Sequence, residues 1–123
     1  MGRRSRALND DEVALYDHVP PEDARRARLV TTPILSPGAN GMTLGRWVLL
    51  RRGHEAVKPL IAHELVHVRQ WREQGRIRFL ARYLAAYLGG LVRLRRHRRA
   101  YLAIPFEVEA REEADAWKER KAI

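Results

Sequence analysis

The sequence of 123 residues contains no cysteine, so neither a disulfide framework nor a thiolate metal ligand is available to it. Histidine, aspartate and glutamate remain as the strong metal ligands. Lysine is also scarce: only three of the 24 basic residues are lysine (Lys58, Lys118 and Lys121), which leaves 21 arginines and a net charge of +9. This balance favours polyanionic partners, although the codon usage of a GC-rich genome would also favour arginine over lysine.

Long hydrophobic runs are missing as well. No apolar stretch follows the basic N-terminal residues in MGRRSRALNDDEV, so we expect no secretory signal. The most apolar run, residues 79–92, is interrupted by Arg82 and is too short to span a bilayer. We therefore expect a cytoplasmic protein, with peripheral association with a membrane left open. The length fits a single domain over residues 1–123.

The order of the expected elements indicates an α+β fold, with a short sheet followed by helices. The segments rich in β-forming residues are 28–35, which Pro33 marks as an edge strand or a strand end, and 42–53. Helices are expected from about residues 56–58 to Gly75, over 76–94 with a kink or break at Gly89-Gly90, and from about Pro105 onward. Residues 1–27 are polar and are expected to form a loop leading into a short helix, flexible or lying over a cleft.

The stretch IAHELVHVRQW, residues 61–71, contains the main functional signal. His63 and His67 are four residues apart, so both imidazoles lie on one side of a helix and can bind one ion. Glu64 points away from that pair and is placed instead to take a proton from a water on the ion. The pattern therefore predicts two metal ligands and a general base.

A His-Glu-x-x-His string also arises by chance, and a histidine on a helix is often only a structural residue. The helical arrangement argues against that interpretation here. Val57, Ile61, Leu65 and Val68 form the expected core face, whereas His63 and His67 lie on another side, together with Gln70 and Gln74. The histidines are therefore expected to face a surface or a cleft, with Leu60 and Trp71 as partial cover.

A catalytic zinc ion normally has three protein ligands, so a further ligand is needed. The last helix offers two glutamates in IPFEVEAREEAD, residues 104–115. Glu107 and Glu109 lie on opposite flanks of the inner face that Phe106, Ala110 and Trp117 define. Either one can point toward the first helix, and an acid at position 107 also fits a simple role at a helix N-terminus.

The two motifs, AHELVHVRQ and EVEAR, resemble those of zincin-like metallopeptidases of the gluzincin type, in particular the small minimal-gluzincin domains of bacteria. The resemblance implies a zinc cofactor bound by His63, His67 and Glu107, with Glu64 as the general base. It also implies a short mixed sheet whose edge strand, around residues 43–51, lines a cleft and pairs with an extended peptide substrate. One departure stands out: the family has aspartate or asparagine four residues after the glutamate ligand, where this chain has Arg111.

Peptidases of this kind also stabilise the oxyanion that forms during hydrolysis. The thermolysin-like families use a tyrosine and a histidine for this, and Tyr101 and His97 are the corresponding candidates by their position before the last helix. Packing of the tyrosine and membership of a basic run are equally good explanations for these two residues.

The segment 69–99 is strongly basic. Between Val68 and Phe106 there are ten arginines and one acid, Glu73. The segment is either a solvated basic face or a surface that binds nucleic acid or an anionic membrane. Two functional hypotheses result: a zinc metallopeptidase acting on a peptide or protein substrate, and a basic binding module whose zinc site is structural or inactive.

Overall fold

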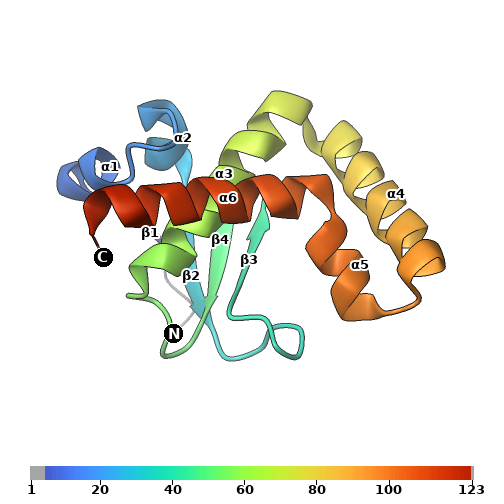
Figure 1. Ribbon diagram of the computed structural model, residues 1–123. Coiled ribbons are helices and arrows are strands. Elements are labelled where there is room, and N and C mark those ends of the chain that lie inside the picture. Colours follow the sequence, from blue (N-terminus) through green and yellow to red (C-terminus); the bar gives the residue numbers. More distant parts are fainter. Residues whose placement is uncertain (1–4, 123) are drawn as a thin grey trace.

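The computed structural model describes residues 5–122. It contains four strands and six helices within that range, arranged as a mixed sheet followed by helices, which confirms the predicted α+β fold (Figure 1). The elements in order are β1 (Ser5–Ala7), α1 (Asp10–Leu15), α2 (Pro21–Arg26), β2 (Arg28–Thr32), β3 (Gly41–Leu44), β4 (Trp47–Arg51), α3 (Lys58–Gln74), α4 (Arg76–Leu94), α5 (His97–Ala103) and α6 (Pro105–Lys121).

The sheet has the strand order β1-β2-β4-β3, with β2 and β4 parallel and both outer pairs antiparallel. The segment expected as one strand over residues 42–53 is instead a hairpin, because Gly45 adopts a φ of 65° and reverses the chain between β3 and β4. As a result β3 is an edge strand, with β1 at the opposite edge, and β4 lies inside the sheet. β2 ends immediately before Pro33, as its position predicted.

The core lies between one face of the sheet and α3. Leu29, Val48 and Leu50 are buried on the sheet, and the expected core face of α3 supplies Ile61, Leu65 and Val68. Val57 was expected in that set but is exposed, because it precedes the first turn of α3. Met42, Leu44 and Trp47 are also exposed.

The N-terminal residues contribute to the core rather than forming a loop. Residues 5–27 form β1, α1 and α2, on the side of the sheet away from β3, and bury Val13 and Tyr16 (Figure 1). Asn9 and Glu12 form a reciprocal capping box that begins α1. Residues 1–4 of the segment interpreted as flexible or cleft-covering lie outside the described residues.

The last helix joins the two ends of the molecule. Trp117 of α6 is fully buried, packs against Tyr16, and donates a hydrogen bond from Nε1 to the carbonyl of Leu15 at 2.8 Å. At its other end α6 leads back to α4 and α5, which lie together on the β3 side of the molecule (Figure 1).

The helix α4 runs through Gly89-Gly90 without the expected break. Gly90 is buried where α5 crosses α4, and a Cβ at this position would lie 3.3 Å from the Cα of Ala100. The glycine therefore permits close helix packing rather than a kink. The helix α5 itself was not expected from the sequence. Within the described residues, none of the helices combines the length and apolar character that a membrane crossing requires.

Candidate metal centre

The helix α3 presents His63, Glu64 and His67. Pro59 lies in its first turn, where a missing backbone N–H leaves no hydrogen bond unmade, so the helix begins at Lys58 as expected. Gly75 ends it with a φ of 80°. The four-residue spacing brings the two imidazole rings together, with their centroids 5.1 Å apart.

The helix α6 packs across α3 and places Glu107 against this histidine pair. Ala110 and Ala114 are buried on the inner side of α6, and their small side chains let the two helices approach closely. The Oε1 atom of Glu107 lies 3.2 Å from Nε2 of His63 and 3.1 Å from Nε2 of His67. One ligand atom from each of the three residues lies within 4.8 Å of the others, so the group could hold a metal ion.

The donor set and its electrostatics fit a divalent cation. His67 and Glu107 are only 5% and 4% exposed. Burial favours a raised pKa for Glu107, but hydrogen bonds with His63, His67 and Tyr83 outweigh it and hold this pKa well below its usual value. Burial likewise opposes charge on His67, but the bond to Glu107 raises its pKa. Two imidazoles and a carboxylate are ligands typical of zinc. A bound cation would supply the positive charge that here comes from the histidines hydrogen-bonded to Glu107.

The two oxygens of Glu107 have separate partners. While Oε1 faces the histidines, Oε2 accepts a hydrogen bond from the hydroxyl of Tyr83 on α4 at 2.7 Å. Tyr83 was not among the site residues expected from the sequence. Its position depends on how α4 packs, which no local pattern indicates. Burial and the charge of Glu107 raise the pKa of Tyr83, so it stays protonated as a donor.

Gln70 orients His67 from the other side. Its Nε2 donates to the carbonyl of Phe106 and to Glu109, both of which only accept, so its Oε1 faces Nδ1 of His67 at 2.7 Å. His67 therefore keeps a proton on Nδ1, and Nε2 is the nitrogen available to a metal ion. A partner of this kind could not be assigned from the sequence, although the spacing already placed Gln70 on the histidine side.

Glu109, the alternative third ligand, lies outside the histidine pair. Its carboxylate accepts hydrogen bonds from Arg69 and Gln70, both at 2.7 Å, and it is not part of the group of His63, His67 and Glu107 that could hold a metal ion. Arg111, at the position where the related families carry a small polar residue, donates to the carbonyl of Leu102 at 2.7 Å and so joins α6 to the end of α5.

The histidine side of α3 was expected to face a surface or cleft. His63 is half-buried, but His67 and Gln70 are buried, because α6 covers this side of the helix. Glu64 is buried as well. The hydroxyl of Thr43 on β3 donates to Oε1 of Glu64 at 2.8 Å, so the edge strand and the carboxylate lie in direct contact.

The two expected oxyanion residues have different surroundings. Tyr101 on α5 is 38% exposed, and burial together with the negative charges of Glu107 and Glu64 raises its pKa. His97 is exposed, and its Nδ1 pairs with the hydroxyl of Tyr87 at 2.7 Å.

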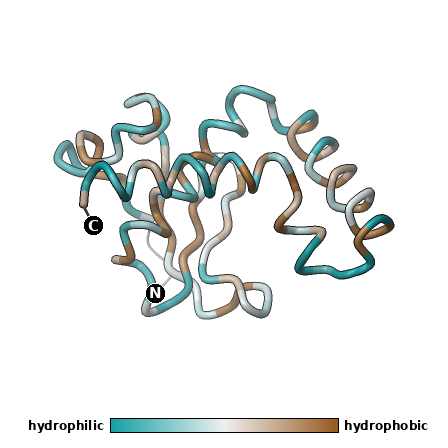
Figure 2. Tube along the Cα trace, viewed as in Figure 1, coloured by the Kyte–Doolittle hydropathy of each residue, from teal (hydrophilic) through white to brown (hydrophobic). Residues whose placement is uncertain are grey.

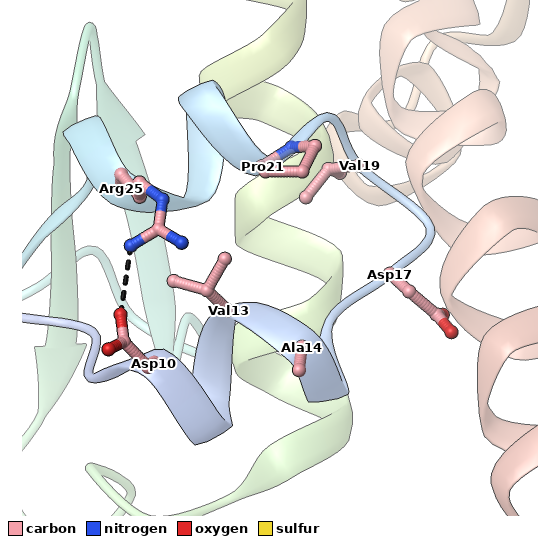
Figure 3. A pocket seen from close by; sticks show the side chains of 7 residues that line it. All are labelled: Asp10, Val13, Ala14, Asp17, Val19, Pro21 and Arg25. Atoms are coloured by element: carbon pink, nitrogen blue, oxygen red, sulfur yellow. Dashed lines mark hydrogen bonds and ion pairs between the residues drawn. The ribbon is translucent and has the colours of Figure 1, made fainter.

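A shallow hollow elsewhere on the surface lies between α1 and α2 (Figure 3). It is crossed by an ion pair between Arg25 and Asp10, with an N–O distance of 2.9 Å. None of its lining residues belongs to the His63–His67–Glu107 group. The residues that line it are Asp10, Val13, Ala14, Asp17, Val19, Pro21 and Arg25.

The strands β2 to β4 and the helix α3 with its two histidines form the part of the chain that a known family model also covers. Residues 22–75 match the eCIS core domain. This domain is predicted to be zinc-metallopeptidase-like. Comparisons with curated proteins and with solved structures gave no match.

The eCIS core match includes His63, Glu64 and His67 but ends at residue 75. Glu107, Tyr83 and Tyr101 all lie beyond it, on α4, α5 and α6. The contribution of these three residues to the site therefore rests on the packing of the helices alone.

Proposed function

We propose that this protein is a zinc-dependent metallopeptidase in which His63, His67 and Glu107 bind the metal ion and Glu64 is the general base. The observation that supports this best is the convergence on both Nε2 atoms of Glu107, which lies 44 and 40 residues after the two histidines in sequence. When bound, a zinc ion supplies Lewis acidity, which lowers the pKa of water and polarises a peptide carbonyl.

The other steps belong to side chains of the chain itself. Glu64 accepts the proton of the attacking water and passes it to the leaving amine. Thr43 holds one oxygen of Glu64 and so leaves the other for this transfer. Tyr101, whose pKa is raised by burial and by the neighbouring carboxylates so that it stays protonated, is the donor that stabilises the oxyanion. The substrate is an extended peptide or protein segment that pairs with the edge strand β3.

The decisive experiment combines metal analysis with the Glu64→Gln variant. We expect about one zinc ion per chain in both the natural sequence and the variant, because Glu64 is not a ligand in this proposal. Hydrolysis of labelled, unfolded casein should fall by about 10²–10⁴-fold in the variant, the usual contribution of general acid–base catalysis. Glu112→Gln, which changes an exposed glutamate of α6, is the matched control and should retain full activity.

The variants Glu107→Gln and Glu109→Gln distinguish the two expected third ligands. Loss of zinc in the first and retention in the second supports the ligand set proposed here. Bound zinc without any hydrolysis in the natural sequence would favour the rival hypothesis of a binding module with a structural or inactive site. A chain that binds no zinc near neutral pH would contradict both.

A further inference from the structure

The helix α4 exposes a continuous apolar stripe. Its residues are between 49% and 86% exposed and recur every three or four positions, so they line one side of the helix over about 22 Å. Figure 2 shows the alternation of hydrophobic and hydrophilic residues along this helix. The stripe consists of Ile77, Leu80, Leu84, Leu88 and Val92.

The opposite side of α4 packs against the rest of the domain. Phe79 is buried and contacts Trp71 and Phe106, with ring centroids 4.4 and 4.7 Å apart, and Gly90 is buried against α5. These contacts fix the rotation of α4 about its axis. The helix therefore packs on the domain through one side and leaves a second, equally apolar side to the solvent. A solvent-exposed apolar surface of this extent usually marks a binding site.

Arginines are frequent along α4 and just after it, and those in this region have no acidic partners within the described residues. Elsewhere in the described residues, five arginines pair with carboxylates, among them Arg6 with Glu12 and Arg72 with Asp23, and six do not. On α4, in the turn after it and at the start of α5, none of the arginine side chains forms a salt bridge within residues 5–122. This unpaired set is Arg76, Arg78, Arg82, Arg93, Arg95, Arg96, Arg98 and Arg99.

The charge selects among the occupants that an apolar stripe can have. A second copy of the chain would bring two arginine sets together, and like charges on both sides oppose such a contact. A nucleic acid would neutralise the arginines through its phosphates but would leave the aliphatic stripe in water. A bilayer with anionic headgroups satisfies both features, because the aliphatic side chains enter the interface while the arginines remain at the phosphates.

We propose that this side of α4 is a docking surface for an anionic phospholipid bilayer, with the helix lying in the plane of the interface. The stripe residues insert among the acyl chains near the headgroups, and the arginine set binds the headgroup phosphates and carboxylates. The metal centre takes no part in this contact, so the docking is independent of the proposed peptidase activity.

The test is co-sedimentation of the full chain with vesicles of phosphatidylcholine, with and without added phosphatidylserine. Binding is expected to the phosphatidylserine vesicles and to weaken as salt is added. Leu84→Asp should lower the partition coefficient about tenfold or more. The matched control Ile34→Asp places the same charge at an exposed site in the loop after β2 and should not change the coefficient. Glu64→Gln should bind like the natural sequence.

A second pair of variants tests the charged part of the surface. Arg98→Gln with Arg99→Gln should weaken binding about tenfold at low salt, and the control Arg26→Gln with Arg52→Gln, equal in charge, should weaken it clearly less. Circular dichroism serves as the check that each variant is folded. The proposal is overturned by equal binding to pure phosphatidylcholine, by a Leu84→Asp variant that binds normally, or by absent binding to the phosphatidylserine vesicles. In the last case, a dimer that Leu84→Asp dissociates would assign the stripe to a second copy, and oligonucleotide binding would assign the arginines to a nucleic acid.

Discussion

The hydrogen bond between Tyr83 and Glu107 leads to the sharpest prediction about the metal centre. Tyr83→Phe removes only the hydroxyl, which lies 2.7 Å from Oε2 of Glu107, and leaves the ring in its contact with Phe79. A hydrogen bond to a charged group contributes about 1.5–3 kcal/mol. Because this bond holds the carboxylate whose other oxygen faces the histidines, most of that energy should be lost from metal binding. We expect the Kd for zinc to rise about 10- to 100-fold.

The assay is a competition for zinc between the protein and a chromogenic chelator at fixed pH. Tyr87→Phe is the matched control, since it removes the same atom one helical turn later, where the hydroxyl contacts His97 instead of the metal centre. Its zinc affinity should equal that of the natural sequence. Thermal unfolding of both variants without metal shows whether either has lost the fold. An unchanged Kd in Tyr83→Phe, or an equal loss in Tyr87→Phe, would refute the assigned role of this tyrosine.

Three further predictions concern stability and activity. The lowered pKa of Glu107 adds folding stability that is lost as the pH falls below about 4.5, and the raised pKa of His67 adds stability that is lost as the pH rises through the raised value. The contribution of this pair to the free energy of unfolding should therefore be largest between about pH 4.5 and 6.5. Denaturant unfolding of the metal-free chain measures it, and the maximum should be absent in Glu107→Gln. Gly89→Ala should stabilise the chain by up to about 1 kcal/mol through helix propensity. Gly90→Ala should be less stable than Gly89→Ala by about 1 kcal/mol or more, because its new methyl group meets α5. Equal melting curves of the two variants would contradict the close packing of α4 and α5. Thr43→Val should lower casein hydrolysis several-fold while leaving bound zinc at one ion per chain, since it frees the general base without touching a ligand; a loss of zinc would show a different role.

The sequence allowed the first half of the site to be predicted because its chemistry is local. Two histidines four residues apart need only a helix, and the turn pattern and Pro59 indicated where that helix begins. The class of fold followed in the same way from the order of the segments. The hairpin between β3 and β4 was missed because Gly45 was counted as part of a strand, although a glycine between two β-rich runs is a typical turn signal.

The second half of the site depends on packing between distant helices, which no local pattern encodes. The choice between Glu107 and Glu109 turns on the rotation of α6, and that rotation is fixed by Ala110, Ala114 and Trp117 in the core. The same docking buries the histidine side of α3, which had been expected to face a cleft. The apolar residues of α4 recur along one side of the helix, yet most of them are exposed, because periodicity alone does not say which side has a neighbour.

The attachment of α6 at both of its ends has a consequence for the biogenesis of the protein. During synthesis the histidine pair leaves the ribosome some 40 residues before Glu107, and α6 is anchored only after Trp117 reaches Leu15 near the start of the chain. A nascent chain therefore holds two imidazoles without their carboxylate and has at most weak affinity for a cation. We infer that binding of a metal ion by all three proposed ligands follows the docking of α6 on the rest of the chain.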